Sequence, residues 1–143
     1  MNSTTLAVTL AAVALVAAAG YGVQSAMSTA PTLMSPGDHD QAWRSIEQAT
    51  RAALGRCRGL PESARHLCRA EARARDRVDK AELDARYYGT IEAQARAEDV
   101  RARARFDVAR SECEARGDDR ASCLAEARTA QAKALALSKV ASS

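Results

Sequence analysis

Aromatic residues are almost missing from this 143-residue chain, which has one Trp, three Tyr and one Phe. The hydrophobic share of 47% therefore consists mostly of alanine, which removes little apolar surface from water per residue. A thick hydrophobic core is excluded, and so is an aromatic platform on which the bases of a nucleic acid could stack. The composition predicts an extended helical protein that does not bind nucleic acid.

Proline is missing after Pro61, so nothing forbids helix over the last 80 or so residues. Ala, Arg, Glu and Leu, which dominate this part, are all strong helix formers. The sequence therefore predicts an all-α fold.

Residues that could carry out catalysis are also scarce. The chain has two histidines, no glycine-rich phosphate loop and no His-Glu-x-x-His metal motif. Its carboxylates precede Arg or Lys by four residues at six places, a spacing that favours ion pairs along a helix: Glu71–Arg75, Asp76–Lys80, Glu82–Arg86, Glu92–Arg96, Asp99–Arg103 and Glu112–Arg116. We expect no enzymatic activity and no cofactor.

One short motif, Asp38-His39-Asp40, could in principle bind a metal ion. The start of a helix capped by Asp38 explains it more simply, because it follows Pro36 and Gly37. We therefore expect no metal site.

Ionisable side chains are absent from residues 1–36 apart from Tyr21. The apolar run from Leu6 to Val16, followed by three alanines, has the length of a signal peptide, and an Ala-x-Ala match ends at Ala19. We interpret residues 1–24 as a signal peptide or membrane anchor, since 6–23 is just long enough to span a bilayer uncleaved. Residues 25–37 are interpreted as a flexible linker, and 38–140 as a periplasmic helical domain.

The strongest pattern is an internal repeat around the four cysteines. Cys57 and Cys68 enclose ten residues, Cys113 and Cys123 enclose nine, and each second cysteine is followed by x-Ala-Glu-Ala-Arg. Gly59 and Gly117 are suited to the left-handed end of a helix. Pro61 suits a first helical turn, and Asp118 or Asp119 could cap the helix that follows. The pattern predicts two helix–turn–helix hairpins.

The repeat places helices over about 38–56, 61–115 and 119–139. The second is unusually long and contains Gly89. It is predicted as one continuous rod of about 80 Å, because no cluster of turn residues accompanies Gly89. The alternative is a break at Gly89 and a four-helix arrangement. Its apolar stripe is interrupted by four charged residues, namely Arg77, Asp84, Glu92 and Asp99.

In a continuous rod, Cys68 and Cys113 would lie about 65 Å apart, so only local pairing is possible. We therefore predict the disulfides Cys57–Cys68 and Cys113–Cys123, which suit an exported chain with a thin core.

The cysteine turns, with the stretch 85–136, resemble a family of small exported proteins of Gram-negative bacteria. These proteins are rich in Ala and charge and have repeated Cys-x(9–10)-Cys hairpins followed by Ala-Glu-Ala-Lys. The resemblance covers most of residues 55–136 and implies an envelope location and helical hairpins, but no reaction. This sequence departs from the family in using Arg where Lys is usual and in lacking a basic residue before the apolar segment.

Positive charge is concentrated in one segment. Residues 51–77 hold eight arginines and three acidic residues, which gives this segment a net charge of +5. Because the whole chain has a net charge of +3, the remaining residues together are slightly acidic. Six of these arginines are candidate contacts for an anionic surface: Arg51, Arg56, Arg58, Arg65, Arg69 and Arg73.

Three functions remain open. The first is a non-enzymatic envelope protein with a structural or interaction role, bound to an envelope protein or to itself. The second is peripheral binding to anionic lipid or polysaccharide through Arg51–Arg77. The third is a redox or metal-stress sensor.

Overall fold

The computed structural model describes residues 34–141 and builds them from four α-helices and one short 3-10 helix. The helices are α1 Pro36–Cys57, α2 Glu62–Tyr88, α3 Ile91–Glu114 and α4 Arg120–Ala141, with the 3-10 helix η1 Gly117–Asp119 before α4. The prediction of an all-helical fold is confirmed for this part of the chain. The signal or anchor segment 1–24 and most of the linker 25–37 lie outside the described residues.

The first helix begins two residues earlier than the sequence suggested. Ser35 is its N-cap, with an Oγ that accepts a hydrogen bond from the backbone N–H of Asp38 at 3.1 Å, and Pro36 occupies the first turn. The carboxylate of Asp38 in turn accepts a hydrogen bond from Ser35 Oγ at 2.7 Å. The prediction of Asp38 as N-cap was therefore wrong, because Ser35 satisfies the free N–H groups of the first turn and Asp38 supports it from within the helix.

Helix α2 ends at Gly89, so the prediction of a continuous rod over 61–115 was wrong. Gly89 adopts the left-handed conformation (φ 64°), and its N–H donates to Ala85 O at 3.0 Å. The next residue, Thr90, caps α3 by accepting from Ala93 N–H at 3.1 Å. Because glycine closes one helix and threonine opens the next, two residues suffice to reverse the chain.

The two cysteine-containing turns are built differently. Gly117 is left-handed (φ 59°), as predicted, and leads through η1 into α4. Gly59 does not have a positive φ, so the prediction for that residue was wrong. The first turn closes instead through tight backbone bonds from Gly59 N–H to Arg56 O and from Leu60 N–H to Cys57 O, both 3.2 Å.

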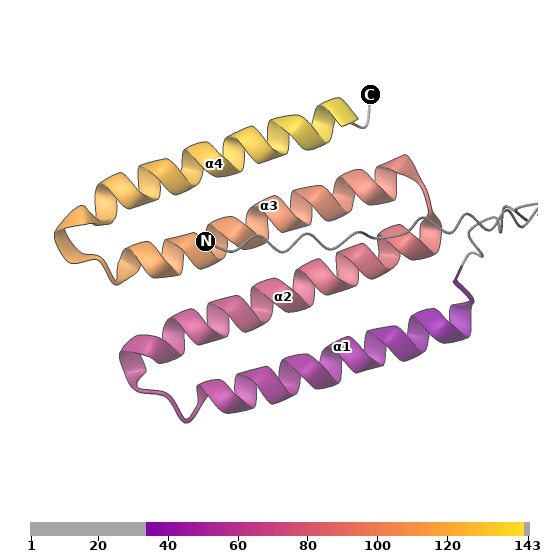
Figure 1. Ribbon diagram of the computed structural model, residues 1–143, viewed down its shortest axis with the longest axis horizontal. Coiled ribbons are helices and arrows are strands. Elements are labelled where there is room, and N and C mark those ends of the chain that lie inside the picture. The colour runs from indigo at the N-terminus through magenta and orange to yellow at the C-terminus, as the bar shows by residue number, and fades with distance from the viewer. Residues whose placement is uncertain (1–33, 142–143) are drawn as a thin grey trace, which may run out of the picture. The chain divides into compact units, whose positions relative to one another are not determined.

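The four helices form a row rather than a bundle. Within the described residues each helix contacts only its neighbours in sequence, α1 with α2, α2 with α3 and α3 with α4 (Figure 1). Both cysteine turns lie at the same end of the helices, and the Gly89 turn lies at the opposite end of the helices. At the cysteine end, His66 Nδ1 in α2 lies 3.8 Å from Glu114 Oε2 in α3. No helix among residues 34–141 has the length and apolar character needed to cross a bilayer.

Small residues fill the contacts between these helices. Leu83 and the cysteines Cys57 and Cys113 are the largest side chains that are fully buried. Within residues 34–140 the other buried apolar residues are all alanines: Ala74, Ala93, Ala97, Ala102 and Ala104. Trp43 and Phe106 are only half-buried. Alanine allows helices to approach closely but contributes little apolar area, so the thin core expected from the composition is present.

Charged residues form ion pairs between neighbouring helices as well as along single helices. Of the six predicted i, i+4 pairs, only Asp76–Lys80 lies within 4.0 Å in the described part of the chain. Three of the four residues that interrupt the apolar stripe instead make bonds between helices. Arg77 donates to Asp107 at 2.7 Å, Asp84 lies 2.9 Å from His39 Nε2, and Asp99 accepts from Ser138.

Replacing Gly89 by alanine tests the break between α2 and α3. Because alanine is strained at a positive φ, we expect Gly89→Ala to lower the free energy of unfolding by about 1 kcal/mol. The matched control is Gly55→Ala, at a helical glycine with no atom within 4 Å of the added methyl group, which should stabilise by about 0.5–1 kcal/mol. The measurement is urea unfolding followed by circular dichroism, and stabilisation by both substitutions would indicate a continuous helix through Gly89.

Candidate functional site

Each of the two turns at the cysteine end brings two cysteines together. Cys57 is the last residue of α1 and Cys68 lies in the second turn of α2, with their Cα atoms 5.7 Å apart. Cys113 near the end of α3 and Cys123 in α4 have Cα atoms 5.6 Å apart. Both pairs of sulfur atoms lie at disulfide distance, in the pairing that the sequence predicted. The rod geometry from which this pairing was predicted is wrong, because α2 and α3 fold back on each other and both cysteine turns lie at the same end of the helices.

The six predicted arginines all lie on the first hairpin. Arg65 donates from Nε and one Nη to Leu60 O at 3.3 and 3.0 Å, so it supports the turn. The other five are exposed, and within the described residues no carboxylate lies within 4.0 Å of their guanidinium groups: Arg51, Arg56, Arg58, Arg69 and Arg73. They come from α1, the turn and α2, so they form a spread of positive charge rather than a single pocket.

A groove of about 540 Å³ runs between α1 and α2 beside the first cysteine pair. Alanines line its floor, and its charged residues are Arg56, Arg75, Glu71 and Asp79. Only Arg56 comes from the predicted arginines. Because two arginines face two acids, the groove has no net charge and does not select an anion.

A second groove of about 450 Å³ lies between α2 and α3 and shares Arg75 and Asp79 with the first. The two grooves therefore open on the same face of the row, on either side of α2. Its floor is apolar, with Ala74, Val78 and Val108 among the lining residues. The charges at its edges again have both signs.

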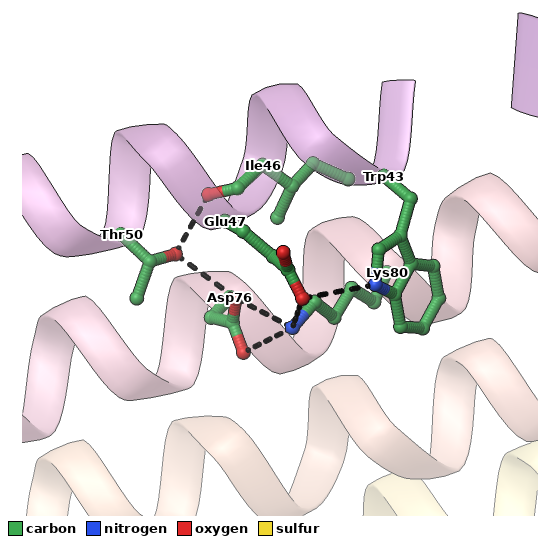
Figure 2. A network of polar contacts seen from close by, with 6 residues as sticks. All are labelled: Trp43, Ile46, Glu47, Thr50, Asp76 and Lys80. Atoms are coloured by element: carbon green, nitrogen blue, oxygen red, sulfur yellow. Dashed lines mark hydrogen bonds and ion pairs between the residues drawn. The ribbon is translucent and has the colours of Figure 1, made fainter. Parts of the chain in front are cut away.

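A network of polar side chains joins α1 to α2 in the middle of the first hairpin (Figure 2). The Nζ atom of Lys80 lies 3.1 Å from one Asp76 oxygen and 4.0 Å from Glu47 Oε1, and it lies 5.0 Å from the centre of the Trp43 ring. Thr50 Oγ1 bonds both Asp76 Oδ1 and Ile46 O at 2.9 Å. Trp43 Nε1 donates to Glu47 at 3.2 Å. This network holds the two helices in register.

The histidine of the Asp38-His39-Asp40 motif belongs to a neighbouring cluster. His39 Nε2 lies 2.9 Å from Asp84 Oδ1, and the imidazole ring is 4.5 Å from the Tyr87 ring. Asp38 bonds Ser35 instead of turning towards His39. No group of three or more His, Cys, Asp or Glu side chains that could hold a metal ion occurs among residues 34–141.

Arg101 in α3 forms the corresponding link between α2 and α3. It donates to Glu82 at 2.5 Å and to Glu98. These hydrogen bonds, with Glu82 first, raise the pKa of Arg101 above its ordinary value, because the carboxylates favour the charged guanidinium. Arg101 is thus held by one acid from α2 and one from its own helix.

Most of these contacts were missed from the sequence. Asp76 and Lys80 were identified only as a pair along one helix, while the bond from Thr50 to Asp76 and the position of Lys80 over the Trp43 ring join residues far apart in the chain. For the contacts of Arg77, Asp84 and Asp99, the available signal was their position in the apolar stripe, because a charged residue on an otherwise apolar face needs a partner there.

No family model, curated protein or solved structure matches this chain.

The contribution of the α1–α2 network is measured by Lys80→Ala. Removing the ammonium leaves Asp76 without its cation and takes the charge from above Trp43, so we expect a loss of about 1–2 kcal/mol in the free energy of unfolding. Because Trp43 is the only tryptophan, its fluorescence emission should also change. Lys133→Ala, an exposed lysine on α4, is the control, and equal effects of both substitutions would contradict a specific role for the network.

Proposed function

We propose that this chain is a non-enzymatic protein of the bacterial envelope, with a structural or interaction role, whose two helical hairpins are each closed by a disulfide. The observation that carries the proposal is the position of the four cysteines as two pairs across the two turns at one end of the row. Disulfides persist in oxidising compartments such as the periplasm. Export by the apolar segment within residues 1–24 is part of the same proposal, and the resemblance of the cysteine turns to exported proteins agrees with it.

The thin core is the reason why such disulfides would matter for stability. Each bond closes a loop of about ten residues, which contributes roughly 2–3 kcal/mol by restricting the unfolded chain. A row of helices with alanine contacts gains little from hydrophobic burial, so this is a large share of a typical domain stability of about 5–15 kcal/mol.

The absence of enzymatic activity is proposed because the side chains most suited to acid–base chemistry already have structural partners. His39 is bonded to Asp84, Lys80 is bonded to Asp76, and His66 Nδ1 lies 3.8 Å from Glu114 Oε2. The hydroxyl of Thr50, which lines the first groove, is bonded to Ile46 O and Asp76 within the network that joins α1 to α2.

A peptide map under non-reducing conditions tests the disulfides. The full chain is taken from the envelope of a Gram-negative host, treated with an alkylating reagent before lysis, and digested. We expect the Cys57 peptide joined to that of Cys68 and the Cys113 peptide joined to that of Cys123, with no alkylated cysteine. A reduced half of the sample is the control. Alkylated thiols in the unreduced half would favour the redox or metal-stress sensor, and any other pairing would contradict the proposal.

The interaction role is tested by chemical crosslinking in intact envelopes, followed by purification of the tagged chain. We expect a discrete adduct, either with a second copy or with another envelope protein. A chain that is never crosslinked at its native abundance would contradict an interaction role.

A second candidate function is binding to an anionic lipid surface, favoured by the five arginines of the first hairpin that have no carboxylate nearby. This mode should be strongest at low salt, because salt screens exposed charges. We expect co-sedimentation with vesicles that contain anionic lipid at low but not at high salt, and loss of binding in Arg69→Glu/Arg73→Glu. The control, Arg96→Glu/Arg103→Glu, makes the same charge change on α3, and absence of binding at low salt rejects this candidate.

A further inference from the structure

The two cysteine pairs are built alike. In each pair the first cysteine lies at or next to the end of a helix and is only 1% exposed, namely Cys57 in α1 and Cys113 in α3. The second cysteine of each pair, Cys68 or Cys123, is half-buried. Because both buried sulfurs lie at the C-terminal end of a helix, the helix dipole acts on them in the same way. Any chemical difference between the pairs therefore comes from the residues around them.

The charges beside the buried sulfurs have opposite sign in the two turns. The first pair has the sequence Arg56-Cys57-Arg58 and the second has Glu112-Cys113-Glu114. The same difference extends over each whole turn. Residues 56–69 hold four arginines and one glutamate, a net charge of +3, whereas residues 112–124 hold two arginines and four acidic residues, a net charge of −2.

Ion pairs do not cancel the positive charge of the first turn. Among residues 34–141, no carboxylate lies within 4.0 Å of the guanidinium groups of Arg56, Arg58 and Arg69. Arg65 donates to the uncharged Leu60 O and so keeps its charge. An anion is therefore attracted to the first turn and repelled by the second.

The first pair can also be approached from a groove. Cys57 and Cys68 both line the groove of about 540 Å³ between α1 and α2, whereas neither cysteine of the second pair lines this groove or the one between α2 and α3. The charged residues of the groove cancel, so the excess positive charge comes from the turn beside it. A small molecule in the groove lies next to the half-buried sulfur of Cys68.

We propose that Cys57–Cys68 is a site of thiol–disulfide exchange with a small anionic thiol, and that Cys113–Cys123 resists the same reagent. The attacking species in such an exchange is a thiolate, which carries a negative charge, and a second thiolate leaves. Both the approach of the first and the departure of the second are favoured by positive charge. The inference rests on the two proposed disulfides and adds a chemical difference between them.

The exchange proceeds in two displacements. The thiolate attacks Cys68 Sγ, a mixed disulfide forms at Cys68, and the electron pair of the broken S–S bond leaves on Cys57 Sγ. Arg56 and Arg58 stabilise this leaving thiolate, which then takes a proton from water. A second thiol, as its thiolate, attacks the sulfur of the bound thiol, which departs with it as a disulfide and leaves Cys68 reduced. The protein pair thereby gains two electrons, which the two thiols lose.

Opening the first pair acts on the edge helix α1. Within residues 34–141, α1 contacts only α2. After the exchange, side-chain contacts such as Lys80 over Trp43 hold it in place, while α3 and α4 stay covalently joined. The fluorescence of Trp43 should therefore change as the first pair is reduced, and an emission that stays constant would contradict a loosening of α1.

Reduction of the full chain by glutathione compares the two pairs within one molecule. The oxidised chain, purified in detergent, is incubated with glutathione, quenched at intervals with an alkylating reagent, and digested for mass spectrometry. We expect Cys57 and Cys68 to become modified roughly ten times faster than Cys113 and Cys123. Early samples should carry glutathione on Cys68 and the alkylating group on Cys57. Salt should lower the ratio of the two rates, and so should cysteamine, a thiol with an ammonium group in place of carboxylates.

Matched charge reversals separate the effect of charge from that of access. Arg56→Glu/Arg58→Glu should slow the reduction of the first pair, and Glu112→Arg/Glu114→Arg should speed that of the second, while circular dichroism checks that both variants remain helical. Rates that are unchanged in both variants would contradict the role of charge.

The wild-type chain alone can overturn the inference. Equal rates for the two pairs, or faster reduction of the second pair, would do so, and glutathione on Cys57 instead of Cys68 would contradict the direction of attack. Free thiols present before glutathione is added would contradict the proposed disulfides themselves, so the two failures are distinguishable.

Discussion

The helices of this protein lie in one row, so no helix covers the gap between two others. A side chain can be buried only by the helix beside it, and this constraint decides which residues occur at each contact. Alanine brings neighbouring helices close together, and Leu83 is the one large aliphatic side chain among those fully buried in the described residues. Besides apolar burial, neighbouring helices are held together by polar contacts, such as Arg77–Asp107 and Thr50–Asp76. The cysteine pairs at the turns add to these contacts.

Local sequence signals predicted the helices and the cysteine turns, because alanine-rich segments and Cys-x(9–10)-Cys spacing act over a few residues. They failed at Gly89, where the decisive feature is the side chain of Thr90 as an N-cap, and at Ser35, which precedes Asp38 in the same role. The links between helices could not be read from spacing at all. Arg77 and Asp107 are 30 residues apart, and their contact exists only because the chain reverses at Gly89.

The candidate site was predicted only in part, because the contacts between its helices likewise cannot be read from local spacing. The two cysteine pairs predicted from the sequence lie at disulfide distance, although the prediction came from a rod geometry that the fold does not have. The arginines were identified as a cluster in sequence, and the structure spreads them over α1, the turn and α2, with Arg65 used to support the turn. A thin row of helices joined by polar links and by two cysteine pairs suits a protein that acts by contact, which is why a structural or interaction role is proposed rather than a reaction.

This row of helices is too poor in large side chains to hold its hairpins by packing alone, and we propose that two disulfides stabilise it. Thermal unfolding followed by circular dichroism, with and without full reduction and alkylation, measures their contribution. We expect reduction to remove roughly 4–6 kcal/mol of stability and to lower the melting temperature by tens of degrees or abolish the cooperative transition. An unchanged transition after complete reduction would contradict it.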